Sequence, residues 1–449
     1  MSSTSSPARA HRMAFLAVCL CWLVVFFDGL DMFIYGAVLP HMLEHKALGI
    51  DGALAGDLGS YATFGMLVGA LCSGTVTDWI GRKKVVLAST ALFSLASALC
   101  AVAPSVGVFG LGRFLAGVGL GGLLPTALTL VSEYAPRGRR ALMVGTLMTA
   151  HQAGGILAGF VGMWTGGENG WRTAFWICVL PLVVGVPLAA KYLPESTSFL
   201  IAKGRGEEAR RLAARYDVDL PVAKAGTPAD GSRWAALASL FKGGLWTSTL
   251  LYWLASFGGL VLVYGVSNWL PSMMRSAGYD LGPALAFMVV INVGGIVGHL
   301  AAGRLSDRFS APRIVTLWFL ITAVTVFLLG VHMPLALTYV VVFLAGAFLF
   351  SAQSMLYAAV AANSDDGNRA TAMGWTTGMG RFGAVLGPWI GGQLAAAHNE
   401  SLGFTVFAVA GFASMVFMLL SQVPGLRAPR RAADDAGDDA NTAGRPVAA

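Results

Sequence analysis

GTVTDWIGRKKVV, residues 74–86, returns later in the chain as GRLSDRFSAPRIV, residues 303–315. Both stretches start with Gly, place Asp at the fifth position and carry a basic residue shortly before Val. A single offset of 229 residues relates three pairs: Gly74 and Gly303, Asp78 and Asp307, and the dipeptides Tyr35-Gly36 and Tyr264-Gly265. Because the pairs lie in separate parts of the chain, the repeat predicts that the chain consists of two halves that descend from one repeated unit.

The sequence around the repeat is strongly apolar. Of the 449 residues, 56% are hydrophobic and 12% are charged, whereas soluble domains average about 25% charged residues. A helix needs about 20 apolar residues to cross a bilayer. Segments of that kind lie near 14–38, 54–76, 85–103, 107–131, 141–164, 172–190, 246–270, 284–303, 314–332, 335–361, 370–396 and 402–422. The sequence predicts an all-α integral membrane protein with twelve transmembrane helices in two six-helix, pseudo-symmetric halves.

The domain layout follows from these spans. The run KGRGEEARRLAARY in the central polar stretch has Ala and Leu at helical spacing and predicts a short surface helix. The charged, small-residue tail lacks apolar periodicity and predicts disorder. The expected order is an N-terminal segment (1–13), a six-helix half (14–190), a linker (191–245), a second six-helix half (246–422) and a tail (423–449).

The basic residues define an orientation. Of 30 Lys and Arg residues, 25 fall on the side that holds both termini and the linker, 3 fall on the opposite side, and Arg113 and Arg381 lie inside spans. Cytoplasmic loops carry the excess of Lys and Arg, so we expect both termini to be cytoplasmic in a multi-pass protein of the cell membrane. This distribution also explains the net charge of +7 without a nucleic-acid partner.

Nothing in the sequence suggests catalysis or a resident cofactor. The five cysteines lie in apolar segments without a CxxC spacing, which is typical of small core residues. The polar segments contain no nucleophile–base pair, metal cluster or phosphate loop. We therefore expect no enzyme activity, no metal and no cofactor.

Two motifs carry a family resemblance. Gly74-x-x-x-Asp78-x-x-Gly81-Arg82 resembles the loop signature of the major facilitator transporters, and Arg113-x-x-x-Gly117-x-Gly119 resembles a second signature of that superfamily. The first-span DGLD, residues 28–31, with the segments at 112–140 and 369–392, resembles the aromatic acid:proton symporters. The resemblance implies alternating access and import of benzoate-type ring acids with protons. The gating candidates in the two repeated loops are Asp78, Arg82, Asp307 and Arg308. Glu133, which ends the fourth span beside an Arg cluster, is a further candidate for a gate or a helix-end salt bridge, with a proton site as its alternative.

Asp28 and Asp31 are the most costly residues in the spans, since an ionised Asp at a bilayer centre costs about 2.5–3.5 kcal/mol. At positions i and i+3 they share one helix face. Burial and mutual proximity favour proton binding by a carboxyl group. We expect this pair, with Arg113 as partner, to couple transport to protons. A purely structural pairing of one Asp with an Arg remains the alternative.

Arg381 is the candidate for the substrate carboxylate, because a guanidinium binds a carboxylate bidentately; a structural role is its alternative. For His151 two roles stay open: lining the cavity, or forming a structural hydrogen bond with a neighbouring helix. Ring substrates need apolar surface around a few polar contacts. The remaining substrate-binding candidates are Gln353, Tyr264, Asn268, Trp375 and Tyr35.

The expected function is a secondary active transporter that imports a small aromatic carboxylate with protons. Two alternatives stay open: a symporter for a non-aromatic organic acid or metabolite, and a proton-driven efflux pump. The expected partners are the substrate, protons and the lipid bilayer. We expect the chain to act as a monomer.

Overall fold

The computed structural model describes residues 7–135, 140–216, 218, 220, 240–241, 245–306, 311–364 and 369–423. Every regular element in this part of the chain is a helix. The first half contains α1 (Pro7–Glu44), η1 (Ala47–Gly49), α2 (Gly52–Ile80), α3 (Arg82–Ala101), α4 (Val106–Tyr134), α5 (Arg140–Trp164), α6 (Gly170–Ile177), α7 (Leu180–Val183) and α8 (Gly185–Tyr192). The linker contains α9 (Thr197–Ala202) and α10 (Gly206–Tyr216). The second half contains α12 (Leu245–Ser276), α13 (Leu281–Ser306), α14 (Ala311–Leu329), α15 (Leu335–Ala362), α16 (Arg369–Ala396) and α17 (Leu402–Leu420).

The helices account for twelve membrane spans. Ten segments of the described chain are long and apolar enough to cross a bilayer, and one of them, Gly170–Tyr192, comprises α6, α7 and α8. This span is interrupted where Pro181 and Pro187 lack the N–H that an unbroken helix needs. Helices α5 and α16, with 25 and 28 residues, are long enough to complete the set. Polar residues interrupt their apolar runs, namely His151 and Gln152 in α5 and Arg381 and Gln393 in α16.

The first helix is longer than its apolar run. It begins at Pro7 and comprises 38 residues, whereas the apolar run predicted a span from residue 14. Proline is favoured in the first turn of a helix, where its missing N–H costs no hydrogen bond. The helix therefore continues beyond the apolar segment.

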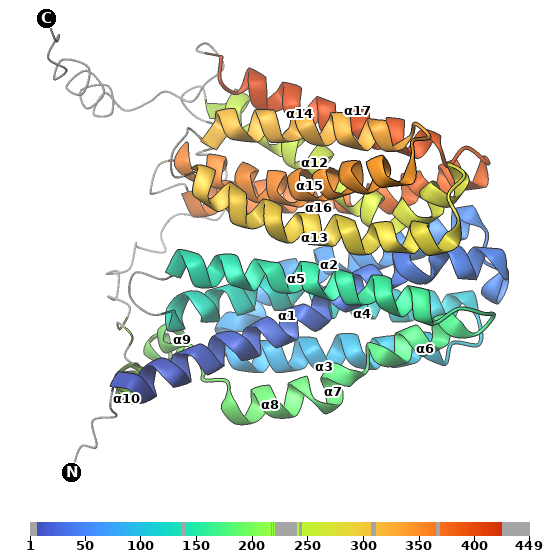
Figure 1. Cartoon of the computed structure of the whole chain (residues 1–449). Helices are drawn as coiled ribbons and strands as arrows, with labels where there is room; N and C mark the ends of the chain where they lie inside the picture. The colour runs from blue at the N-terminus through green and yellow to red at the C-terminus, as the bar shows by residue number, and fades with distance from the viewer. Residues whose placement is uncertain are drawn as a thin grey trace, which may run out of the picture.

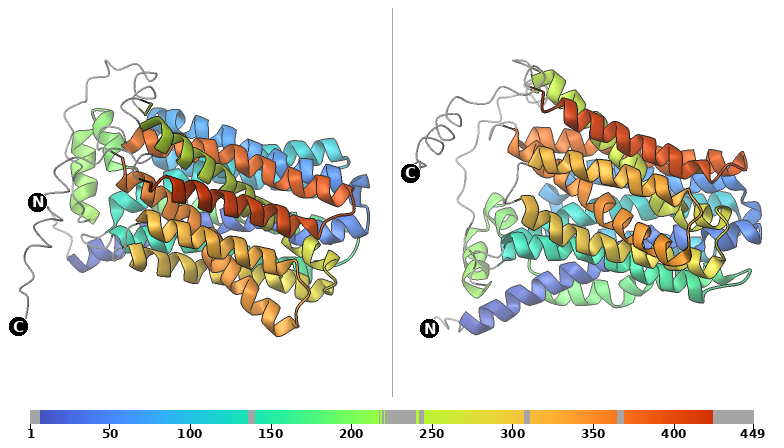
Figure 2. Two further views of the ribbon diagram at one scale, coloured as in Figure 1. Left: turned by 90° about the horizontal axis from the view of Figure 1, so that it is seen from above. Right: turned by 45° about the horizontal axis from the view of Figure 1, so that its top comes forward.

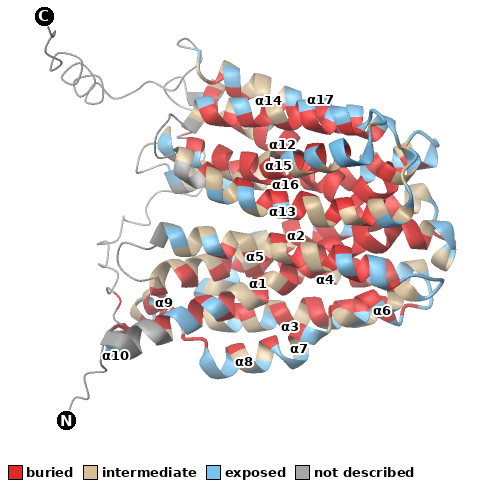
Figure 3. Cartoon of the chain, viewed as in Figure 1, coloured by how far each residue is buried: buried red, intermediate tan, exposed pale blue. Residues whose placement is uncertain are grey.

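The helices lie side by side with their axes roughly parallel (Figure 1). We call the end of the bundle that carries α9 and α10 the linker end, and the end that carries η1 the far end. Helix α1 begins and α17 ends at the linker end, as the turned views in Figure 2 also show. Buried residues line the faces where helices meet, and large apolar residues are exposed on the outer surface (Figure 3).

The two halves contact each other through α1 with α12, α2 with α16, and α5 with α13. The 229-residue offset relates α1 to α12, α2 to α13, and α5 to α16. The pairs α2–α16 and α5–α13 are therefore equivalent contacts of one pseudo-twofold arrangement. The repeat in the sequence thus predicts which helices form the interface between the halves.

The interface is closed at the far end. A Cβ atom added to Gly56 of α2 would lie 2.7 Å from Gly392 Cα of α16. Ser60 Oγ of α2 donates to the Val385 carbonyl of α16 at 2.9 Å. Glu44 and Arg275, at the far ends of α1 and α12, form an ion pair of 2.8 Å. The two halves are thus held together on this side of the bundle.

The same helices diverge toward the linker end. Gly74 of α2 and Gly374 and Gly378 of α16 face open space, with no described atom within 4 Å of an added Cβ. Close helix contact normally requires small residues of this kind. The structure therefore represents a state in which the described parts of α2 and α16 separate toward the linker end.

Candidate functional site

The two carboxylates of α1 have different surroundings. Asp28 and Asp31 are 2% and 0% exposed. Asp28 Oδ2 lies 3.2 Å from His151 Nδ1 of α5, at the interface between the halves. Asp31 Oδ1 accepts a short hydrogen bond from the Ser97 hydroxyl of α3, inside the first half. The structure therefore separates the two carboxylates that share a face of α1.

Arg113 of α4 is a buried cation without an ion-pair partner among the described residues. Its guanidinium lies over the Tyr35 ring at 4.9 Å and near the Phe175 ring at 5.9 Å. Its Nε and one Nη have no described hydrogen-bond partner. The charge of Arg113 nevertheless acts on Asp31. A buried charge is stable only when it is paired, so this arrangement suits a cation that gains an anionic partner in another state.

The second half supplies the other buried guanidinium. Arg381 of α16 donates from Nη1 to the Tyr264 hydroxyl of α12 at 3.0 Å, and its Nε has no partner among the described residues. The charge of Asp28 acts on both Arg381 and Tyr264. A carboxylate of one half and a guanidinium of the other therefore lie close enough to interact through their charges, but the two do not form a described ion pair.

Aromatic rings border this group of charges. Phe33 of α1 lies 5.5 Å from the His151 ring and packs edge-on against Phe350 of α15, with 6.0 Å between ring centroids. Phe33 and Phe350 belong to different halves, so the apolar contact crosses the interface. Aromatic rings prefer such edge-to-face or offset partners. The arrangement places aromatic rings beside the His151 imidazole and its carboxylate partner Asp28.

The other substrate-binding candidates have internal partners. Gln353 Nε2 donates to Ser256 Oγ at 3.0 Å, and its Oε1 has no described partner. Asn268 donates to the Tyr264 carbonyl one turn earlier at 2.8 Å. The Tyr35 hydroxyl donates to the Ala55 carbonyl at 2.7 Å. The Gln353 side-chain carbonyl is thus a buried acceptor without a described partner.

Trp375 does not join the central group. Its ring stacks on Trp253 of α12 at 5.7 Å, and 39% of the residue is exposed. It shares a helical stripe with Phe382, Leu386 and Trp389, all of which are exposed. This stripe is the outer surface of α16, where Trp residues are typical of a membrane boundary.

The predicted gating residues that the structure describes, Asp78, Arg82 and Glu133, lie at the linker end. Arg82 and Asp78 form an i,i+4 ion pair of 3.4 Å at the turn between α2 and α3, in which the Asp78 side chain is exposed and the Arg82 side chain is mostly buried. Glu133 accepts hydrogen bonds from the Ser196 hydroxyl at 2.8 Å and the Thr197 N–H at 2.9 Å. Glu133 therefore connects α4 to the start of α9. Asp307 and Arg308 lie outside the described residues.

Two residues, Glu195 and Ser97, make contacts around these candidate residues that were not apparent from the sequence. The Glu195 carboxylate accepts a hydrogen bond from the Lys83 N–H at 3.1 Å and packs against Gly81. Gly81 has a φ of 100° and forms the turn between α2 and α3. Ser97 is the partner of Asp31. The position of Ser97 within an apolar span indicates a buried hydroxyl, and a buried hydroxyl needs a hydrogen-bond partner.

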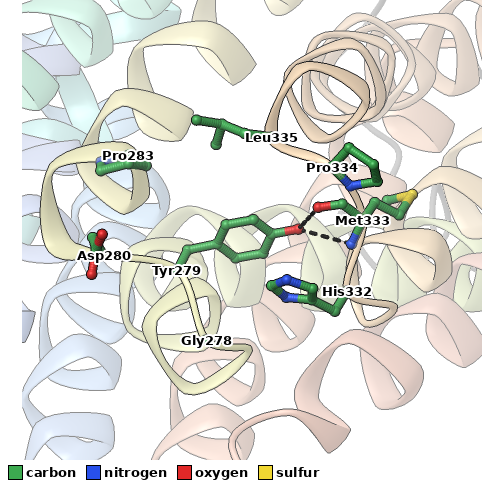
Figure 4. Close-up of a pocket in the computed structure, with 8 residues that line it drawn as sticks. All are labelled: Gly278, Tyr279, Asp280, Pro283, His332, Met333, Pro334 and Leu335. Carbon is green, nitrogen blue, oxygen red and sulfur yellow. Dashed lines mark hydrogen bonds between the residues drawn. The ribbon is translucent and has the colours of Figure 1, made fainter.

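A separate hollow of about 460 Å³ opens at the far end of the second half, lined by Gly278, Tyr279, Asp280, Pro283, His332, Met333, Pro334 and Leu335. Tyr279 bonds to the Met333 backbone and stacks on His332, with 5.1 Å between rings (Figure 4). None of the predicted site residues lines it. The hollow is thus distinct from the charges between the halves.

Comparison with known proteins supplies the family. The model of the Major Facilitator Superfamily matches residues 21–361 and 292–448. A benzoate transport protein of Acinetobacter baylyi is 36% identical over 84% of this chain and 82% of its own. A 4-hydroxybenzoate transporter of Pseudomonas aeruginosa is 36% identical, with 88% and 92% covered. A gentisate transporter of Corynebacterium glutamicum is 33% identical, with 89% and 85% covered.

A solved structure extends the likeness to the fold. The xylose transporter of E. coli, in a partially occluded inward open conformation, superposes with a TM-score of 0.73 at 17% identity, covering 92% of this chain and 98% of its own. The twelve spans and the pseudo-twofold interface are thus those of a known transporter fold.

Proposed function

Because this chain belongs to the Major Facilitator Superfamily, a family of transporters and not of enzymes, we propose that it imports a small aromatic carboxylate together with protons by alternating access. The observation that carries the proposal is a set of opposite charges within the spans. Asp28 on α1 and Arg381 on α16 lie at the interface, and Asp31 on α1 and Arg113 on α4 lie inside the first half. Charges at membrane depth are typical of substrate and proton pathways.

Arg381 is the proposed substrate anchor. Its Nε lacks a described partner, and its Nη1 is fixed by Tyr264 at 3.0 Å. A guanidinium held in one orientation can bind a carboxylate bidentately. The Phe33–Phe350 contact crosses the interface, and its buried rings would offer apolar surface to a ring acid when the halves move apart. The three relatives compared above transport benzoate, 4-hydroxybenzoate and gentisate, all of which combine a ring with a carboxylate.

Asp31 and Arg113 are the proposed coupling pair. Asp31 is held by Ser97, and the nearby Arg113 has unpaired donors. A protonated Asp31 has no net attraction for Arg113, whereas an ionised one does. Loss of the proton would therefore draw the two groups together and change the packing of α1 against α4. This exchange of partners is the proposed link between proton release and movement of the halves.

The linker end is proposed to face the cytoplasm of a cell-membrane protein that acts as a monomer. The distribution of Lys and Arg, 25 against 3, supports this orientation. The described separation of α2 from α16 then corresponds to an inward-facing state. The Asp78–Arg82 pair and the contacts of Glu133 with α9 are the proposed elements that hold conformations at this end.

The decisive experiment is uptake into proteoliposomes of a panel of radiolabelled acids: benzoate, 4-hydroxybenzoate, gentisate and the non-aromatic succinate. We expect accumulation of a ring acid when the outside is acidic, and its loss when an ionophore removes the gradient. Accumulation of succinate alone would favour the non-aromatic alternative. Export of a ring acid from the vesicles, driven by protons that enter them, would favour an efflux pump. The absence of proton-dependent flux for every acid would refute the proposal.

A further inference from the structure

We propose that His151 and Asp28 form a second proton-binding site, which takes up a proton when the substrate carboxylate binds at Arg381. The inference rests on the proposed function, since it concerns the proton that accompanies that carboxylate. It differs from the proposed Asp31–Arg113 coupling pair in both location and neighbours. Asp28 faces the interface between the halves, and Asp31 faces the interior of the first half.

The geometry of the pair suits a shared proton. His151 Nδ1 lies 3.2 Å from Asp28 Oδ2, and the side chains are 19% and 2% exposed. The other ring nitrogen, Nε2, lies 3.0 Å from Met32 Sδ, and a thioether is only a weak acceptor. Asp28 Oδ1 has no described partner. The carboxylate is therefore the one strong hydrogen-bond partner of the imidazole, and the imidazole is the more accessible group of the two.

The charged groups around His151 come from several helices. On α13, His299 is already engaged: Nδ1 donates to the Gly295 carbonyl at 2.8 Å, and Nε2 contacts the Ser354 hydroxyl at 3.2 Å. On α12 and α16, Tyr264 and Arg381 interact with the charge of Asp28.

Asp31 and Arg113 belong to the group inside the first half. Imidazoles are the side chains that normally change charge between pH 5 and 8. Among the groups around the interface, His151 is the imidazole that contacts a carboxylate.

The electrostatics couple this proton to the substrate. With Asp28 ionised, a second carboxylate at Arg381 would place two negative charges near one guanidinium. Two carboxylates in one site favour the binding of a proton. A proton on His151 neutralises the charge of Asp28 at 3.2 Å and leaves the charge of Arg381 to the substrate. By linkage, the bound substrate strengthens proton binding, and the proton strengthens substrate binding by the same factor.

The test measures equilibrium binding of benzoate to the purified full chain at pH 6, 7 and 8. Benzoate stays ionised over this range, because carboxyl groups normally titrate near pH 4. We expect the affinity of the wild type to fall as pH rises, by up to about tenfold per pH unit for one linked proton. Proton uptake on binding is measured in parallel with an indicator dye in weak buffer.

The variant His151→Gln keeps an N–H for Asp28 but cannot take up a proton. We expect it to bind benzoate with a flattened pH dependence and with about one proton fewer taken up per benzoate. His41→Gln is the matched control: His41 is a second buried His, bonded to the Gly162 carbonyl at 3.3 Å near the far end of α1. We expect this control to keep the slope of the wild type.

The outcomes separate the two proposals. If the wild type binds no ring acid, the proposed function fails and this inference fails with it. If the wild type binds benzoate with a pH slope that His151→Gln retains in full, the second site is refuted while the proposed function stands. Benzoate binding by the wild type without any proton uptake refutes it as well. That last measurement needs no variant, so the second site can be refuted even if His151→Gln does not fold.

Discussion

The substitution Gly56→Ala tests whether the far-end contact between α2 and α16 determines the conformation of the protein. An added Cβ would lie 2.7 Å from Gly392 Cα and 3.1 Å from the Pro388 carbonyl oxygen. Contacts below 3.0 Å to backbone atoms cannot be relieved by rotating a side chain. The helices must therefore move apart at the far end, where the described structure is closed.

The size of the effect follows from this overlap. Forcing one extra methyl group into a packed contact costs about 1–3 kcal/mol. The cost applies to the far-end-closed state and is absent once α2 and α16 have separated there. A free energy of this size shifts a two-state population about 5–150-fold. We therefore expect Gly56→Ala to move the protein toward the far-end-open state.

The assay is a pulsed electron spin resonance distance between labels at positions 51 and 397, which lie at the far ends of α2 and α16 and are exposed. The exposed native cysteines, Cys19 and Cys72, are first replaced by Ser. Gly107→Ala is the control: it is the same chemical change at the far end of α4, with no described atom within 4 Å of the new Cβ. Any gain in helix propensity is common to both variants.

The expected result is a longer-distance population in Gly56→Ala that the control lacks. Suppose that Gly56→Ala, the control and the parent give the same short distance. The methyl group would then be accommodated by small local shifts, without separation of α2 and α16 at the far end. The reasoning that this contact governs the balance between states would then be wrong.

Four further predictions concern the proposed site and gate. Asp31→Asn should abolish accumulation driven by a pH gradient, because Asn cannot bind and release a proton. It should retain substrate exchange, because exchange does not require the empty carrier to return deprotonated; counterflow and uphill uptake measured on one preparation check this. Tyr264→Phe should weaken benzoate binding roughly tenfold to a hundredfold in calorimetry, since a hydrogen bond to a charged group contributes about 1.5–3 kcal/mol and Arg381 loses its partner at 3.0 Å. Asp78→Asn should slow uptake while benzoate affinity changes little, because the residue lies at the linker end; loss of binding would contradict a gating role. Glu133→Gln should lower the free energy of unfolding by about 1 kcal/mol in a denaturation experiment, since the carboxylate caps the start of α9; unchanged stability would show that the cap is dispensable.

The sequence predicts the architecture well, for a physical reason. A bilayer demands long apolar helices, and a repeat at a constant offset relates their order, so spans and interface pairs follow from the pattern. The interruption of the sixth span was less apparent: the run near 172–190 was predicted as one helix, yet it is divided around Pro181. Proline is tolerated within membrane spans, so its presence alone does not predict a break.

The partners of the charged groups could not be predicted in the same way. His151 is 123 residues from Asp28, and Ser97 is 66 residues from Asp31. Which of them lies opposite a carboxylate depends on the rotation of each helix about its axis. Helices that lack a strongly polar face leave that rotation undetermined in the pattern. Trp375 illustrates the same limit, since its exposed position on α16 follows from how that helix packs on α12.

The two carboxylates of α1 show what this rotation decides. Residues three apart on a helix point about 60° from each other, because each residue turns by about 100°. On an isolated helix that makes them neighbours. In this fold α1 lies between the interface and the interior of the first half, so 60° is enough to direct Asp28 toward His151 and Asp31 toward Ser97. A group at the interface can respond directly to a substrate carboxylate, whereas a group inside one half can respond only to its own neighbours, here Arg113. In the proposed mechanism, substrate sensing and conformational coupling therefore fall to different members of the DGLD motif, and α1, which carries both, is the element through which one would affect the other.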